Sequence, residues 1–181
     1  MTHNRIHIFG ASVSGVSTLG KSLSTALDIP VYDFDDYYWL KTDPPYTKKC
    51  EKHKRYELLL NDLNGKNDFI ISGHYGTSFE PLDDMLSLVV FLYVPKEIRQ
   101  LRIRNRELME YGTRILQGGD MYESHEEFVE WSGHYDDNNR EGRKLIRHEQ
   151  RLSLLKCNIL RITGNLPQDE VKNIVLKKLL T

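Results

Sequence analysis

Two glycines near the start of the chain have the spacing of a phosphate-binding loop. Gly10 ends an apolar run, and Gly15 follows five residues later, before a helical pattern. Such glycines let successive backbone N–H groups point inward at a phosphate, and the next helix adds its positive end. The predicted phosphate-binding residues are Gly10, Ala11, Ser12, Val13, Ser14, Gly15, Val16, Ser17 and Thr18. The Ser17 hydroxyl takes the position of a Mg²⁺ ligand. The alternative is a strand-to-helix turn that binds nothing.

Two residues depart from the G-x-x-x-x-G-K-[ST] pattern of such loops. Val16 stands where the pattern has lysine, which removes the cation that reaches the β- and γ-phosphates. Val13 places a branched side chain where these loops often have glycine, and it is strained if the position requires a positive φ. Lys21 lies about one helical turn further on and points away, so it does not replace the missing lysine.

A second group of chemically capable residues is the run Asp33-x-Asp35-Asp36 at the end of a short predicted strand. Ligands of open α/β sheets bind outside the carboxyl ends of strands, so these carboxylates should lie beside the glycine loop. Residues 33 and 35 would share one side of an extended chain. One carboxylate could hold Mg²⁺ and the other could accept a proton from a substrate hydroxyl. The alternative is a solvated turn or a helix N-cap.

Arginines form the third group. Arg99, Arg102 and Arg106 recur on one face of a predicted helix, and Arg114 follows. Guanidinium groups can clamp phosphates or stack on a base. We expect at least one of Arg102, Arg106 and Arg114 to contact the nucleotide. The alternative is a solvated helix face. Arg143, beyond this segment, is a weaker candidate.

Further motifs narrow the chemistry. The aromatic stretch from Tyr37 to Thr47 is either an acceptor pocket or an apolar patch that anchors a loop. The histidines show no metal-ligand spacing. Ser72, at the end of the third predicted strand, stands where motor ATPases and switch GTPases hold Mg²⁺ with an aspartate, which argues against both classes.

The elements that must position these groups alternate between strand and helix. Predicted strands cover residues 5–9, 31–32, 69–72, 88–94 and 159–162, with helical patterns between them. This alternation predicts an α/β fold with a parallel sheet and helices on both faces. We expect one domain over residues 1–181, with an acceptor-binding segment at about 36–66 and a strand-free helical lid at about 105–147.

Composition limits the remaining possibilities. The 181 residues are 39% apolar and carry a net charge of −1, so no basic field indicates nucleic acid or a membrane surface. The apolar runs are too short to cross a bilayer, and the short stretch before the first predicted strand leaves no room for a signal peptide. Two distant cysteines suit a reducing compartment. We therefore expect a cytoplasmic protein, monomeric or homodimeric.

Several motifs together resemble those of bacterial adenylate-kinase-like proteins of the P-loop superfamily, over nearly the whole chain. The motifs that carry the resemblance are the glycine loop with Thr18-Leu19-Gly20, Asp33-x-Asp35-Asp36-x-x-Trp39, Thr42-Asp43-Pro44-Pro45, Leu92-x-x-Pro95-x-x-Ile98-Arg99, Arg114-Ile115-x-x-Gly118-Gly119-Asp120-Met121-Tyr122 and Phe128-x-x-Trp131.

The resemblance implies a nucleotide-kinase fold, with a five-stranded parallel sheet in the order 2-3-1-4-5. It also implies that ATP phosphates bind the glycine loop and that Ser17 and Asp33 serve Mg²⁺. Asp33 and Asp35 match an acidic pair between metal and acceptor, and Arg102, Arg106 and Arg114 match lid-side arginines. AMP is not supported as acceptor, because lysines and one arginine replace the AMP-binding arginines after strand two.

Two main hypotheses follow. The first is a Mg²⁺-dependent phosphotransferase that moves the γ-phosphate of ATP to a small-molecule or nucleotide acceptor. The second is a nucleotide-binding module with weak or no catalysis, which Val16 favours and the retained acidic pair disfavours. A folded relic without nucleotide affinity is a third possibility.

Overall fold

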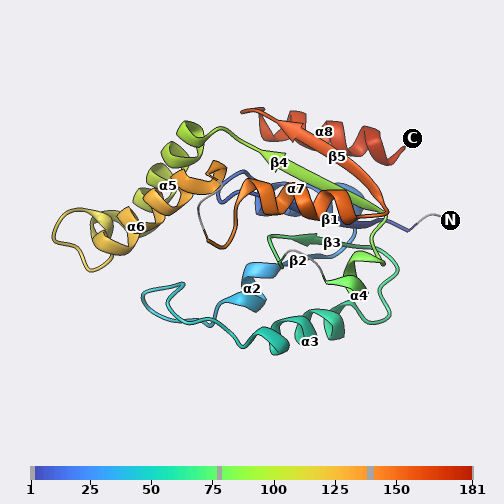
Figure 1. Cartoon of the computed structure of the whole chain (residues 1–181), viewed down its shortest axis with the longest axis horizontal. Coiled ribbons are helices and arrows are strands. Elements are labelled where there is room, and N and C mark those ends of the chain that lie inside the picture. The colour runs from blue at the N-terminus through green and yellow to red at the C-terminus, as the bar shows by residue number, and fades with distance from the viewer. Residues whose placement is uncertain (1–2, 77–78, 138–140, 181) are drawn as a thin grey trace.

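The computed structural model describes residues 3–76, 79–137 and 141–180, which form a parallel sheet covered by helices (Figure 1). Five strands pair in the order β2-β3-β1-β4-β5. The strands are β1 (Arg5–Gly10), β2 (Val31–Asp33), β3 (Phe69–Ser72), β4 (Leu88–Tyr93) and β5 (Asn158–Thr163). Every pairing is parallel, which confirms the fold class and the strand order that the sequence led us to expect.

Helices fill the connections between the strands. They are α1 (Val16–Leu27), α2 (Phe34–Tyr38), α3 (Lys52–Leu63), α4 (Glu80–Asp83), α5 (Lys96–Tyr111), α6 (Tyr122–Gly133), α7 (Leu145–Leu154) and α8 (Gln168–Leu179), with the 3-10 turns η1 (Gly112–Ile115) and η2 (His134–Asp136). The sequence analysis missed the short α4 and placed residues of α2 in a loop. Both helices are too short to show a periodic apolar pattern.

The two faces of the sheet have different cores, because successive strand residues point to opposite sides. Ile6 and Ile8 of β1 pack in a cluster with residues of α1 and α8. Phe9 points to the other face and packs with residues of α2, α3, α4 and α7. His7 is on this second face as well and is fully buried, in ring contact with Phe9 and Tyr75. One face is thus apolar, while the other carries buried polar groups.

Helices α5 and α6, joined by η1, form an arm that reaches past the sheet on the same side as α2 (Figure 1). The arm overlaps the expected lid segment of about 105–147 but begins before it, at Lys96. Residues 138–140 of that segment lie outside the described residues. No described helix has both the length and the apolar character needed to span a membrane.

Arg99 fixes the root of this arm. Its side chain is fully buried and donates to the Val94 carbonyl at 2.6 Å and to the Asp136 carboxylate at 2.8 Å. It also donates to the Ser132 carbonyl. The expectation that Arg99 belongs to an open arginine face is therefore wrong, since this arginine joins α5 to α6 and η2.

Candidate active site

The glycine loop between β1 and α1, residues 10–18, is called the donor loop below. Gly10 leaves no room for a side chain, because a Cβ there would lie 2.3 Å from the Leu92 carbonyl oxygen. Val13 and Gly15 both have positive φ, at 53° and 96°. The loop therefore keeps a left-handed conformation at residue 13 although a β-branched residue stands there, and such a conformation is strained.

The donor loop and the start of α1 fit a bound phosphate. The N-cap residue Gly15 makes no side-chain cap hydrogen bond, and the first turn of α1 holds no acidic residue. The first N–H groups of a helix lack partners within the helix. No carboxylate of that turn competes with an incoming anion here, so the positive helix end remains available to phosphate oxygens.

Val16 gives the donor loop no cation. Its half-buried side chain packs against the apolar cluster formed by α1, α8 and the sheet. Arg102, predicted to bind nucleotide, reaches the loop from α5 instead. Its Nη1 donates to the Val13 carbonyl at 3.2 Å, and its Nη2 donates to Asn165 Oδ1 at 2.6 Å. Arg102 thus supports the strained residue of the loop.

The predicted acidic pair lies at the carboxyl end of β2, but not on an extended chain. Asp33 is the N-cap of α2, and its Oδ1 accepts a hydrogen bond from the Asp35 backbone N–H at 3.1 Å. Asp35 is in the first turn of that helix. The prediction of an extended segment over these residues is therefore wrong, because the capping carboxylate favours helix from Phe34 onward.

The two carboxylates still influence each other. Asp35 keeps part of its surface open to solvent, yet surrounding protein atoms desolvate its carboxylate and raise its pKa. Arg143 opposes this rise, whereas Asp33 and Asp36 add to it. A carboxylate with a raised pKa is better suited to accept a proton near neutral pH.

Arg143, a weaker candidate in the sequence analysis, lies between the donor loop and the acidic pair. It precedes α7, and its Nη1 donates to Ser12 Oγ at 3.3 Å. Burial lowers the pKa of its guanidinium, and Asp35 is the largest influence in the opposite direction. The structure therefore brings a cation from the far end of the chain to the donor loop.

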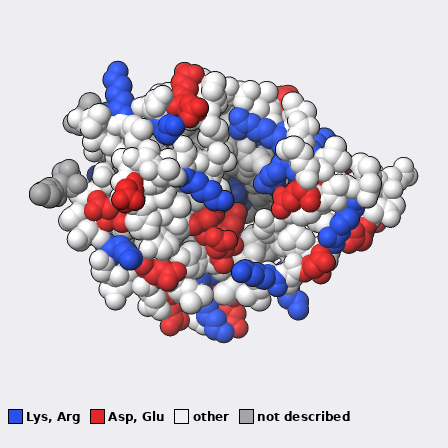
Figure 2. All heavy atoms as spheres, turned by 180° about the vertical axis from the view of Figure 1, so that it is seen from behind, with Lys and Arg blue, Asp and Glu red and all other residues white. Residues whose placement is uncertain are grey.

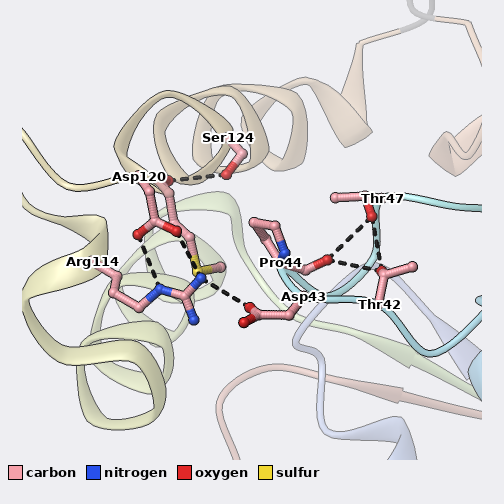
Figure 3. Close-up of polar contacts among 8 residues, drawn as sticks. Thr42, Asp43, Pro44, Thr47, Arg114, Asp120 and Ser124 are labelled. Carbon is pink, nitrogen blue, oxygen red and sulfur yellow. Dashed lines mark hydrogen bonds and ion pairs between the residues drawn. The ribbon is translucent and has the colours of Figure 1, made fainter.

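Arg106 and Arg114 lie farther along the arm. Arg106 is exposed and pairs with Glu107 at 3.2 Å, but its charge also acts on the Asp35 carboxylate. Arg114 donates to Asp120 at 2.7 Å and to Asp43 at 2.9 Å, so it bridges the arm and the segment after β2 (Figure 3). The structure shows no contact of Arg114 with the donor loop, and its catalytic role stays a prediction.

The aromatic residues after β2 pack on one another. The rings of Tyr38 and Trp39 lie 4.8 Å apart, and those of Trp39 and Tyr46 lie 5.8 Å apart. The Arg55 guanidinium lies 3.9 Å from the centre of the Tyr38 ring. These contacts fit the expected loop anchor, and Tyr46 remains largely exposed for contact with an acceptor.

Beneath the site lies a buried polar network that the sequence analysis did not predict. Arg151 of α7 is 1% exposed and donates to the Asp83 carboxylate at 2.6 Å and to the Tyr75 hydroxyl. The same arginine contacts His7 Nδ1 at 3.0 Å. His148 contacts His74 at 3.0 Å. Residues from four segments of the chain are therefore tied together on this face of the sheet.

The protonation of His7 follows from its partners. An arginine can only donate, so Nδ1 accepts from Arg151, and Nε2 carries the proton and donates to the Gly73 carbonyl at 2.8 Å. Burial, reinforced by Arg151, lowers the pKa of His7 well below its usual value. The network thus ends on Gly73, where a Cβ would lie 3.4 Å from Asp33 Oδ1. We call residues 73–76 the floor loop.

A single sequence signal could have indicated this network. His7 interrupts the apolar run of β1, and a buried polar residue needs a partner. Its partners lie 66 and 144 residues away, which no local pattern reveals.

The surface view shows a recess in the middle of one face, with acidic and basic side chains along its edges (Figure 2). Within residues 3–76, 79–137 and 141–180, no three His, Cys, Asp or Glu side chains form a metal-binding group. The assignment of Ser17 and Asp33 as Mg²⁺ ligands stays a prediction.

Comparisons with known proteins give the class first. The crystal structure of a shikimate kinase from Aquifex aeolicus superposes with a TM-score of 0.52 at 22% identity, and covers 96% of this chain and 94% of its own. A gluconokinase from Sinorhizobium meliloti superposes with a TM-score of 0.54 at 14% identity, over 99% of this chain and 92% of its own. The sheet order and the donor loop thus define the P-loop kinase fold.

Sequence comparison gives the family. The uncharacterized protein YqaC of Bacillus subtilis is 40% identical over 171 residues, which are 94% of each chain. The chain belongs to the same family as YqaC. A shikimate kinase of Aquifex aeolicus is 36% identical over 105 residues, or 52% of this chain and 62% of the kinase. No protein-family model matches the sequence.

Proposed function

We propose that this protein is a phosphotransferase that moves the terminal phosphoryl group of ATP, with Mg²⁺, to a hydroxyl of a small-molecule acceptor. The observation that carries the proposal is the contact of Arg143 with Ser12 of the donor loop at 3.3 Å while its charge acts on Asp35. A phosphate-binding loop and an acidic pair thus face one space. A mere structural turn would need neither group.

The relatives support a small molecule rather than a nucleotide as acceptor. The sequence relative with partial coverage is named shikimate kinase, and the structural neighbours include a shikimate kinase and a gluconokinase. The acceptor site of this chain would lie between Asp33, Asp35 and the floor loop. The arm residue Arg106 lies near enough to lower the pKa of Asp35, and the Asp35 carboxylate adds to the raised pKa of the Tyr46 hydroxyl, so both residues border the same space.

Each residue has a defined task in the reaction. Asp35 accepts the proton of the acceptor hydroxyl while the oxygen of that hydroxyl forms a bond to the terminal phosphorus of ATP. The bond from that phosphorus to the bridging oxygen breaks, and ADP keeps the electron pair. Backbone N–H groups of the donor loop bind the phosphate oxygens. Ser17 and Asp33 would hold Mg²⁺, which neutralises charge on the phosphates when bound.

A nucleotide-binding module without catalysis is the second candidate. Val16 leaves its place without a cation, and Val13 strains the loop at a φ of 53°. Loss of one charge-stabilising contact costs on the order of 3 kcal/mol in a transition state. In such a module ATP would close the arm over the site, and a partner would recognise the closed shape.

The test is ATP consumption with a panel of hydroxylated acids, sugars, nucleosides and nucleotides. We expect turnover with a hydroxylated small molecule, and loss of that turnover in Asp33→Asn. Asp28→Asn is the matched control, because Asp28 is an exposed residue in the left-handed turn after α1, which asparagine accepts. Binding of ATP without turnover of any acceptor would favour the module and reject the phosphotransferase.

A further inference from the structure

The donor loop has no lysine at position 16, and Val16 provides no charge in its place. Val16 packs into the apolar cluster beside α1 and α8. Lys21 of α1 is exposed and lies beyond the first turn. A loop that handles the charge on β- and γ-phosphates therefore needs a cation from elsewhere in the fold.

The arginines of the arm are engaged in other tasks. Arg99 is buried at the root of α5. Arg102 donates to the Val13 carbonyl and to Asn165, so both terminal nitrogens of its guanidinium already have protein acceptors. Arg106 pairs with Glu107, and Arg114 pairs with Asp120 and Asp43.

Arg143 has a different geometry. Its Nη1 lies 3.3 Å from Ser12 Oγ, on a side chain of the donor loop rather than on its backbone. Its charge interacts with Asp35 and Asp33, where the acceptor would bind. A guanidinium in this position spans the path between donor loop and acidic pair, and it can offer two parallel N–H groups to phosphoryl oxygens.

We propose that Arg143 supplies the cation that the donor loop lost at position 16, donating to the terminal phosphate of ATP as that group leaves for the acceptor. This inference rests on the proposed function. It makes Arg143 a catalytic residue that comes from the segment before α7, about 130 residues beyond the loop that it completes.

A physical argument favours this arrangement over an arginine that serves only the fold. Arg143 is half-buried, and in the free protein the carboxylates of Asp35 and Asp33 balance its charge. Ser12 Oγ is a neutral partner at the long end of the hydrogen-bond range, at 3.3 Å. An incoming phosphate oxygen would be a stronger partner for the same N–H group.

The experiment measures the binding of ATP and of AMP by calorimetry with Mg²⁺, in the wild-type protein and in variants that remove or add one charge. We expect Arg143→Ala to raise the Kd for ATP roughly tenfold to a hundredfold, the usual range for a hydrogen bond to a charged group. The Kd for AMP, which lacks the β- and γ-phosphates, should change little. Arg161→Ala, which removes an exposed arginine that pairs with Glu149, is the matched control.

The decisive variant restores the lysine. Val16→Lys in the Arg143→Ala background should recover most of the lost ATP affinity, whereas Val16→Met, of similar length without charge, should not. Circular dichroism would verify that each variant is folded. Arg143→Ala with unchanged ATP affinity, with equal losses for ATP and AMP, or without recovery by the folded lysine variant would overturn the inference.

The outcomes separate this inference from the proposed function. A wild-type protein that binds no ATP would reject the proposed function itself. A wild-type protein that binds ATP, with an Arg143→Ala variant that binds it equally well, would reject only the role of Arg143. An effect of Arg143→Ala confined to the KM of the acceptor would place the arginine on the acceptor and contradict the inference.

Discussion

The donor loop and the floor loop meet at the same end of the sheet, but the protein holds them in different ways. The donor loop is one continuous stretch, shaped by Gly10, by positive φ at residues 13 and 15 and by Arg102 at its back. The floor loop, residues 73–76, is fixed by a buried network of Asp83, Arg151 and His7. The backbone of the donor loop is thus local in sequence, and distant side chains such as Arg102 and Arg143 are added to it. The floor loop depends wholly on distant residues.

This difference has a physical meaning. The phosphate-binding backbone N–H groups and helix end of a donor site come from one short motif, and only the added cation has to come from elsewhere in the chain. An acceptor site must match one molecule, so its polar groups need fixed orientations. The buried network provides that orientation on one face of the sheet, while the opposite face, under α1 and α8, is apolar.

The largest expected effect is on the acceptor side. Asp35→Asn should lower kcat roughly a hundredfold to ten-thousandfold, because it removes the proton acceptor. In the wild type, the pKa of Asp35 is raised by desolvation, so activity should fall with decreasing pH through a value above the usual aspartate range. A pH–rate profile measures this. A wild-type acid limb at the ordinary aspartate value would contradict it.

The same variant should raise stability. A carboxyl group whose folded-state pKa is raised weakens the folded state once it ionises, so Asp35→Asn should unfold at a higher temperature at neutral pH. The gain should vanish below the unfolded pKa, where Asp35 is protonated in both states. Thermal unfolding at neutral and acid pH would show the difference, and a uniform gain across pH would speak against this cause.

The network beneath the floor loop should carry the next effect. Asp83→Ala leaves Arg151, 1% exposed, without its carboxylate partner, and should lower the free energy of unfolding by about 3–5 kcal/mol. Asp84→Ala breaks an exposed pair with Lys156 and should change it by about 0.5 kcal/mol or less. Urea unfolding compares the two. Equal effects of these neighbouring substitutions would remove the proposed role of the network.

A smaller effect is expected in the donor loop. Val13→Gly should raise the free energy of unfolding by about 1 kcal/mol, because it relieves the backbone strain at a φ of 53°. This net gain already allows for the opposing effect of glycine, which increases the entropy of the unfolded chain. ATP should also bind more tightly. Val16→Gly, the same exchange at the start of α1, should destabilise the protein. A stabilising Val16→Gly or a destabilising Val13→Gly would contradict the strain.

The ion pair between Arg114 and Asp43, which joins the arm to the segment after β2, should have the smallest effect. Asp43→Ala removes the contact with Arg114 that joins the arm to the segment after β2 (Figure 3). We expect a rise in the KM of the acceptor that fades at high salt, with kcat unchanged. Glu126→Ala breaks the Arg104 pair within the arm and is the control. Equal changes in both variants would show that the bridge has no special part.

The sequence predicted much of the fold and of the donor side. The apolar run of β4 and the break at Gly10 located central strands and the donor loop, and the family resemblance supplied the strand order. These features depend on residues near one another in the chain, where periodicity and turn chemistry act.

The acceptor side could not be predicted in the same way, because its residues are far apart in the chain or belong to very short elements. Asp33 caps a five-residue helix, α2, which shows no period that could be recognised. Arg99 belongs to an arginine row in the sequence, but its position at the root of the arm buries it. Arg143 and Arg151 contact residues near the N-terminus because α7 packs on one face of the sheet and Arg143 lies just before that helix.

The most direct test of the central claim is thermal unfolding of the wild-type protein with increasing ATP or adenosine, in the presence of Mg²⁺. A ligand that binds only the native state raises the apparent Tm in proportion to its affinity and concentration. Because the donor loop addresses phosphates, we predict a saturable rise of Tm with ATP and almost none with adenosine. No rise with ATP, or an equal rise with adenosine, would contradict the account.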